Sequence, residues 1–202
     1  MEHVRSRRLL ACVLAAGVVA GCGGRELTYD EEIAAWRVEK DRFMRESSES
    51  PVVAANRTSF APLPYFPVSD AYRVPAALEV IQTQDIIEMS TSTNQRRRMR
   101  RIGTLKFTLK GQALELTAFV DAKDSDMRRL FVPFNDLTNG TETYPGGRYL
   151  DLDRTATGIY DLDFNRAYHP FCVFNPEYEC PVPPRENRLQ VPVRAGEKLA
   201  RS

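Results

Sequence analysis

The chain has 202 residues, with 28 basic and 27 acidic residues, and its formal net charge at pH 7 is +1. This length is typical of a single domain, and a chain so close to neutral has no global field that would attract nucleic acid. It carries two histidines, His3 and His169, which excludes metal centres built from several imidazoles. Phosphate-loop and dinucleotide-binding motifs are absent from the sequence, so no nucleotide cofactor is expected.

Residues 1–22 follow the order of a bacterial lipoprotein signal, with basic residues, an apolar stretch, small residues and then a cysteine. The basic positions are Arg5, Arg7 and Arg8, the apolar stretch runs from Leu9 to Ala20, and Gly21 precedes Cys22. About a dozen apolar residues are too few to cross a bilayer, which takes about 20. We therefore expect residues 1–21 to be removed as a signal peptide, Cys22 to carry lipid chains such as palmitate, and residues 22–28 to form a tether.

The expected location is the cell envelope. Two or more acyl chains on Cys22 would anchor the protein stably to a membrane. Gly23 stands where an Asp would retain the protein at the inner membrane in many bacteria. The outer membrane, with the protein facing the periplasm, is therefore the predicted site.

Two cysteines remain for the folded domain. Cys12 is lost with the signal and Cys22 carries lipid, which leaves Cys172 and Cys180. In an oxidising compartment such a pair is expected to form a disulfide. An alternative is a hydrolase that uses Cys172 as nucleophile and His169 as base, although Pro170 between them opposes a helix that would bring them together.

Residues 29–46 are predicted to form an amphipathic helix. Thr28 followed by Glu31 is typical of a capping box. Apolar residues then recur at helical spacing on one face, at Ile33, Trp36, Phe43 and Met44. Serines and Pro51 end the helix, and its apolar face is expected to cover the core.

The remainder of the domain reads as short strands separated by Gly, Asn, Asp and Pro turns. The candidates are residues 72–80, 86–90, 105–109, 114–120, 130–134, 149–152, 159–164 and 189–193. Lys110 and Gly111 separate two of them as a hairpin turn. The predicted fold is mainly β, an antiparallel sandwich or barrel of about eight strands with one N-terminal helix, in a single domain over residues 29–202.

Polar residues cluster in two segments after residue 134. Residues 135–148 form a long polar loop, which is uncommon unless it has a role. A second cluster lies between residues 161 and 188. Dense polar residues among aromatics form either a satisfied buried network or a site. As a candidate pocket we take Asp136, Thr143, Tyr144, Arg148, Asp163, Asn165 and Asn187.

These segments resemble the bacterial domain-of-unknown-function family 1684, over about residues 29–198. The residues that carry the resemblance are Asp136–Gly140, Thr143–Tyr144, Gly146–Leu150, Asp163–Tyr168, Pro170, Cys172, Cys180–Leu189 and Ala195–Lys198. The resemblance implies relatives but no reaction. His169 stands where an Asn is expected in many relatives, which argues against His169 as a catalytic base.

The predicted function is an envelope lipoprotein that binds a small polar or anionic ligand in the candidate pocket. The alternatives are a hydrolase that uses the same Asp, Asn and Arg side chains, and a structural envelope component. A Ca²⁺ or Mg²⁺ site at Asp136, Glu142 and Asp163 has no matching motif, so no metal is predicted. The expected partners are the membrane and a small molecule, with no nucleic acid.

Five arginines between residues 96 and 101 form the densest charge run. We expect a solvated hairpin loop or a protected strand edge. Contact with anionic lipid head groups is the functional alternative.

Overall fold

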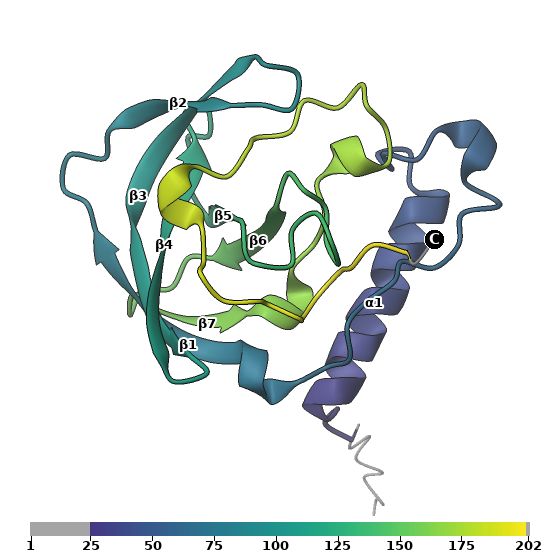
Figure 1. The fold of residues 1–202 in the computed structure, drawn as a ribbon, viewed down its shortest axis with the longest axis horizontal. Helices are drawn as coiled ribbons and strands as arrows, with labels where there is room; N and C mark the ends of the chain where they lie inside the picture. Colours follow the sequence, from purple (N-terminus) through teal and green to yellow (C-terminus); the bar gives the residue numbers. More distant parts are fainter. Residues whose placement is uncertain (1–24, 201–202) are drawn as a thin grey trace, which may run out of the picture.

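A computed structural model describes residues 25–200 of the chain (Figure 1). The predicted signal peptide and Cys22 lie outside the described residues, so they stay predictions. Helix α1 (Tyr29–Glu46) has the predicted bounds. Its capping box is formed, because the Thr28 backbone N–H donates to Glu31 Oε2 at 2.9 Å and the Glu31 N–H donates to Thr28 Oγ1 at 3.4 Å. Local sequence therefore determines where this helix begins.

Seven antiparallel strands follow and form a nearly closed barrel. They are β1 (Arg73–Val80), β2 (Ile86–Ser90), β3 (Arg96–Leu109), β4 (Gln112–Asp121), β5 (Arg129–Phe134), β6 (Arg148–Asp153) and β7 (Ile159–Asp163). The strand order is β6-β5-β4-β3-β1-β7, and β2 pairs with β3. The predicted antiparallel β fold with one helix is confirmed, and it is a barrel.

The β3–β4 hairpin was correctly predicted from its turn. Leu109 pairs with Gln112, so the turn consists of Lys110 and Gly111, with φ of 51° and 79°. Two residues at positive φ match the right-handed twist of the strands. Near the other end of the hairpin a bulge lies between Arg101 and Gly103, where β3 approaches β1 closely. A Cβ on Gly103 would lie 2.4 Å from the Glu79 carbonyl oxygen.

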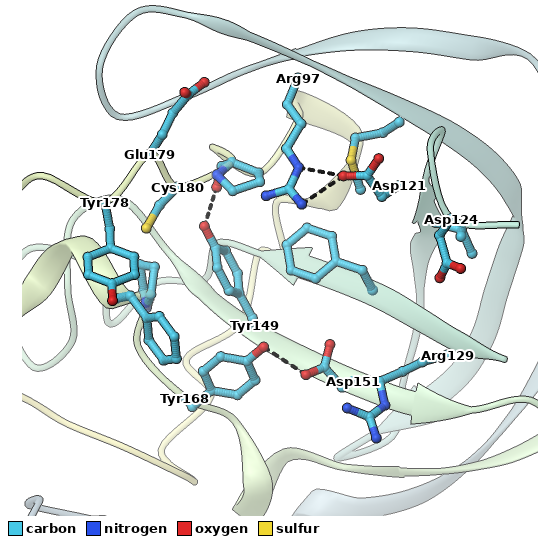
Figure 2. Close-up of a pocket in the computed structure, with 16 residues that line it drawn as sticks. Arg97, Asp121, Asp124, Arg129, Tyr149, Asp151, Tyr168, Tyr178, Glu179 and Cys180 are labelled. Carbon is cyan, nitrogen blue, oxygen red and sulfur yellow. Dashed lines mark hydrogen bonds and ion pairs between the residues drawn. The ribbon is translucent and has the colours of Figure 1, made fainter. Parts of the chain in front are cut away.

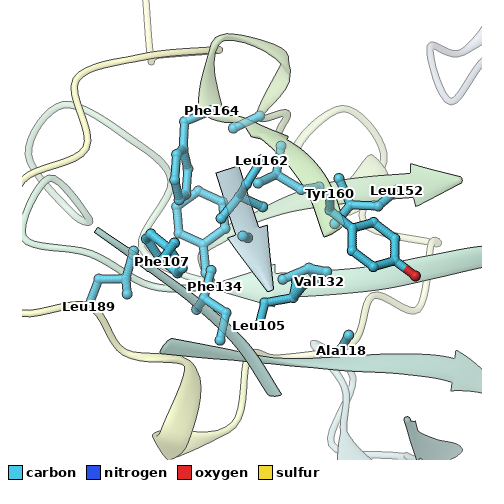
Figure 3. Packing of buried hydrophobic residues seen from close by; sticks show 14 of the residues in the cluster. Leu105, Phe107, Ala118, Val132, Phe134, Leu152, Tyr160, Leu162, Phe164 and Leu189 are labelled. Carbon is cyan, nitrogen blue, oxygen red and sulfur yellow. The ribbon is translucent and has the colours of Figure 1, made fainter. Parts of the chain in front are cut away.

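The barrel interior is the main core. Alternate residues of each strand point inward, as the pleat requires, and Figure 3 shows Phe107, Phe134 and Phe164 packed together. The ring centroid of Phe164 lies 5.8 Å from that of Phe107 and 5.4 Å from that of Phe134. A second cluster forms on the outer face of the sheet, from the buried residues Met89, Met99 and Phe119 with Ile87 and Phe131 packed against them.

One predicted strand is wrong. Residues 189–193 alternate between buried and exposed but are not a strand. Leu189 donates its N–H to the Asn135 carbonyl, whereas the Val193 N–H donates to Asp136 Oδ1 at 3.1 Å. The Leu137 N–H also donates to the Val191 carbonyl. The segment thus makes scattered hydrogen bonds to residues 135–137 instead of a continuous strand ladder, where it crosses the end of the barrel beside the 135–147 loop.

The arginine run is not a hairpin loop. It forms the first part of β3, and Arg96–Arg100 pairs with β2. Two of these arginines are paired: Arg97 with Asp121 and Arg101 with Glu186. The lipid contact stays a prediction.

Helix α1 lies beside the barrel (Figure 1), next to the ends of the strand order, β6 and β7. Residues from α1, β6 and β7 together line a cleft of about 510 Å³. The Tyr29 hydroxyl donates to Asp163 Oδ1 at 2.8 Å, and Lys40 Nζ lies 2.6 Å from Glu197 Oε1. Within residues 25–200, no helix is long and apolar enough to span a membrane.

Candidate functional site

The candidate pocket of the sequence analysis begins with Asp136 and Arg148, which the structure brings together inside the protein. Arg148 Nη2 donates to Asp136 Oδ2 at 2.8 Å, and both side chains have no solvent exposure. Arg148 also donates to the backbone carbonyls of Val193, Ala195 and Glu197. Burial lowers the pKa of Arg148 and Asp136 opposes that shift. This pair joins β6 to the C-terminal segment.

Thr143 and Tyr144 lie nearby but in other contacts. The hydroxyls of Thr143 and Thr138 are 2.9 Å apart, and both side chains are buried. The Tyr144 N–H donates to His169 Nε2 at 3.3 Å. Burial, with Arg148 and Lys40 adding to it, lowers the pKa of His169 to about 3. His169 is therefore neutral.

Asp163 and Asn165 belong to a separate network at the base of α1. Asn165 Nδ2 donates to the Tyr29 hydroxyl at 2.8 Å and to the Ser69 carbonyl at 2.9 Å. Burial and Asp163 raise the pKa of Tyr29 well above its usual range, so Tyr29 stays a donor to Asp163. The network attaches the helix to the end of β7.

Asn187 belongs to a third network. Its side chain pairs with both backbone groups of Thr117 at 2.8 Å and donates to the Pro133 carbonyl at 2.7 Å. The predicted pocket residues thus lie in several hydrogen-bonded networks, most of them buried, and a pocket at these residues stays a prediction.

Other carboxylates of the two polar segments are also paired. Glu142 pairs with Arg194, Asp161 with Arg73 and Glu186 with Arg101. Among residues 25–200, no group of three or more His, Cys, Asp and Glu side chains is arranged to hold a metal ion.

Cys172 and Cys180 lie next to each other as free thiols. The Cys172 N–H donates to Cys180 Sγ at 3.1 Å, and Cys172 Sγ lies 4.0 Å from the Tyr144 hydroxyl. Burial raises the pKa of the Cys180 thiol to about 12. The His169 ring nitrogens face Tyr144 and Glu197 and not the Cys172 thiol, so the geometry offers no Cys-His pair. The disulfide stays a prediction.

A solvent-facing site lies on the outer face of the barrel, where residues 168–181 cross over β3 to β6 (Figure 2). We call it the aromatic cleft. Its volume is about 340 Å³, within the range of small-molecule sites. Its aromatic residues are Phe131, Tyr149, Tyr168, Phe171 and Tyr178, and its charged residues are Arg97, Asp121, Asp124, Arg129, Asp151 and Glu179.

Two rings of the cleft, Phe131 and Tyr168, each stand nearly perpendicular to Tyr149. The centroids of Phe131 and Tyr149 are 4.7 Å apart at 74° between the rings, and those of Tyr149 and Tyr168 are 5.7 Å apart at 90°. The Tyr149 hydroxyl donates to the Pro181 carbonyl, which ties the crossing segment to β6. Such edge-to-face pairs hold rings in one orientation.

Asp151 lies among these rings. It pairs with Phe131 in the β5–β6 register and follows Tyr149 by two residues, so all three share the outer face. The Tyr168 hydroxyl donates to Asp151 Oδ2 at 2.8 Å (Figure 2). Desolvation by the surrounding protein raises the pKa of Asp151. The Tyr168 hydrogen bond and the positive charges of Arg129 and Lys40 oppose this rise. Asp151 still reaches solvent.

On the rim of the cleft opposite Asp151, an arginine is paired with a carboxylate. Arg97 Nε donates to Asp121 Oδ2 at 2.8 Å, and Arg97 Nη2 lies 2.7 Å from the same oxygen (Figure 2). Arg129 lies 3.5 Å from Asp153 Oδ1 and is mostly exposed. The cleft therefore has four carboxylates and two guanidinium groups in its lining, an acidic surplus.

Sequence reasoning missed this cleft, although one signal was available. In the predicted strand at 149–152, Leu150 and Leu152 face the core, which leaves Tyr149 and Asp151 on the outer face. Phe131 repeats this outward placement on the neighbouring strand. An aromatic pair beside a carboxylate on an outer face is a candidate site, but the register that joins them is not visible in the sequence.

Comparisons with known proteins agree with this fold. The family model described as "Protein of unknown function (DUF1684)" matches residues 58–198. The chain is also similar to the solution NMR structure of the uncharacterized protein from gene locus rrnAC0354 of Haloarcula marismortui. The identity is 40%, the match covers 83% of this chain and 92% of that chain, and the TM-score is 0.66. Among curated proteins, no match was found.

Proposed function

Because the chain belongs to the family described as protein of unknown function DUF1684, which names no reaction, we propose a function from its geometry: the protein binds a small polar ligand in the aromatic cleft. The cleft lies entirely within the matched residues 58–198. The observation that carries the proposal is Asp151, a solvent-accessible carboxyl held by Tyr168 among aromatic rings.

Several properties of the cleft support binding. Aromatic side chains present flat apolar surface to a ligand at low entropic cost, and a few fixed polar groups supply orientation. The ring orientations are fixed before any ligand arrives, which lowers the cost of binding. The acidic surplus favours a neutral or positively charged ligand over an anionic one.

We place this binding function in the cell envelope, on a lipid anchor at Cys22. The support is the sequence pattern of residues 1–22. The test is expression in a bacterium of the wild type, Cys22→Ser and, as a matched control, Cys12→Ser. In detergent phase separation, we expect Cys22→Ser alone to move from the detergent phase to the aqueous phase. Mass spectrometry should show that this variant also lacks the mass of the acyl chains. Unchanged partitioning of Cys22→Ser would contradict the anchor.

The binding function is tested by a thermal-shift screen of small polar compounds against the purified full-length protein. Compounds that raise the melting temperature are then titrated by calorimetry against Phe131→Leu and the control Phe60→Leu. Both phenylalanines are half-buried, but Phe60 packs against Phe174, away from the cleft. We expect Phe131→Leu to weaken binding at least about fivefold, since it removes a ring face. Equal affinities of the two variants would place the ligand elsewhere.

A hydrolase that uses the same cleft is the second candidate. It is favoured by Asp151, because a carboxyl with a raised pKa is suited to act as a general acid. Mass analysis of each stabilising compound after incubation separates the two functions. An unchanged compound supports binding, and conversion that Asp151→Asn abolishes supports catalysis.

A further inference from the structure

We propose, on the premise of that binding function, that the ligand of the aromatic cleft is an organic cation. Its ammonium group would lie beside Asp151, among the rings of Phe131, Tyr149 and Tyr168. The faces of aromatic rings carry negative potential, and a cation within about 6 Å of a ring centroid is attracted to it. A carboxylate beside several rings adds a direct charge partner.

The backbone determines this arrangement. Phe131 and Asp151 are opposite each other in the β5–β6 register, and Tyr149 is two residues before Asp151 on the same strand. Tyr168 is brought to the same place by its antiparallel bridge with Tyr149. Main-chain pairing holds each position, with Phe131, Tyr149 and Asp151 on strands of the sheet and Tyr168 on the crossing segment that is bridged to β6.

The charges around the cleft leave room for a cation. Arg97 is occupied by Asp121 in one hydrogen bond and an ion-pair contact, so Asp121 is the carboxylate already neutralised. Arg129 and Lys40 both contribute to the field at Asp151. Each is paired with another carboxylate, because Arg129 Nε lies 3.5 Å from Asp153 Oδ1 and Lys40 Nζ lies 2.6 Å from Glu197 Oε1. The Tyr168 hydroxyl donates to Oδ2 of Asp151. Asp151 therefore keeps acceptor capacity for a donor that comes from solvent.

A cation of the protein already uses one of these rings. Lys40 Nζ of α1 lies 4.2 Å from the Tyr168 ring centroid. It is only 17% exposed, and it is also paired with Glu197. The Tyr168 ring thus stabilises a desolvated ammonium group in the folded protein, which is the interaction proposed for the ligand.

The test uses the full-length protein and three probes: choline, its neutral isostere 3,3-dimethyl-1-butanol, and methyl glucoside. Binding is measured by calorimetry and by shifts of the tyrosine and phenylalanine ring signals in NMR spectra. We expect choline to bind about tenfold more tightly than the isostere, since a desolvated cation–π contact with a charge partner is worth that much. Asp151→Asn keeps an acceptor for Tyr168 and should remove this preference.

Asp153→Asn is the matched control, because it removes the same charge from the same strand outside the aromatic cleft. It should preserve the preference for choline. Equal binding of choline and its isostere, or a preference for choline that survives Asp151→Asn, would overturn the proposal that the ligand is a cation. If methyl glucoside or another neutral compound binds and shifts the ring signals while choline does not, the proposal of a cationic ligand is overturned and the proposed binding function remains. If no compound of the screen binds either, the binding function and the cationic ligand are both contradicted.

Discussion

Arg148 and Asp136 form an ion pair in which neither side chain is exposed to solvent, with Nη2 and Oδ2 2.8 Å apart. Asp136 Oδ1 also accepts the N–H groups of Thr138 and Val193. One carboxylate thus joins the loop after β5 to β6 and to the C-terminal segment. Its role in this structure is to hold three parts of the chain together.

Replacing one partner of this pair leaves a buried charge without compensation. We expect Arg148→Met to lower the free energy of unfolding by about 3–5 kcal/mol in urea denaturation. The control is Arg128→Met, whose ion pair with Asp126 is exposed, at 85% and 47%. It should change the stability by less than about 0.5 kcal/mol. Equal effects of the two substitutions would show that the buried pair has no structural role.

Acid should destabilise the protein through His169. Its pKa is about 3 in the folded state, lowered by burial and by Arg148 and Lys40, and about 6.5 in an unfolded chain. Between these values the unfolded state binds a proton that the folded state does not. Stability is therefore complete above pH 6.5 and falls by up to about 1.4 kcal/mol per pH unit below it. His169→Asn should flatten the pH dependence of urea unfolding, and an unchanged slope would contradict this assignment.

A methyl group should be poorly tolerated at Gly196, near the C-terminal end of the chain. Its φ is +74°, and a Cβ would lie 2.4 Å from the Ala167 carbonyl oxygen. Gly140 has nearly the same φ, +80°, with nothing within 4 Å of a Cβ. Gly140→Ala should cost about 1–2 kcal/mol from the backbone conformation alone. Gly196→Ala should cost clearly more in the same unfolding measurement, and equal losses would contradict the steric contact.

The disulfide between Cys172 and Cys180 can be tested on the mature protein isolated under oxidising conditions. We expect peptide mass mapping to show the loss of two hydrogens and no labelling of either thiol before reduction. Closing this short loop should stabilise the protein by about 2.5 kcal/mol. Cys172→Ser with Cys180→Ser should lower the melting temperature to that of the reduced wild type. Full labelling of both thiols without reduction would contradict the prediction.

Much of the fold could be predicted because its signals are local. The Thr28 cap, the Lys110–Gly111 turn and the alternation along β4 depend on neighbouring residues, and all three are confirmed. The family resemblance is also confirmed, over residues 58–198. The alternation of apolar residues at 189–193 led to a wrong strand prediction, because an extended segment can bury one face without pairing to a strand.

The candidate site could not be predicted in the same way. Asp136 and Arg148 are 12 positions apart and polar, and their sequence does not distinguish a buried pair from a solvent-facing site. Desolvation and the nearby Val193 backbone decide this, and both depend on the C-terminal segment. The group around Asp151 draws on β5, β6 and the crossing segment, so it exists only once these have paired.

The sequence by itself determined the helix bounds, most of the strands and the family, because these depend on composition, periodicity and short motifs. A short motif is also the basis for the predicted lipid anchor at Cys22. Only the tertiary structure decided which polar residues are buried partners and which face solvent. That distinction depends on strand register, on the 168–181 crossing and on the hydrogen bonds left over after main-chain pairing. These long-range relationships place Tyr149, Tyr168 and Asp151 in one cleft.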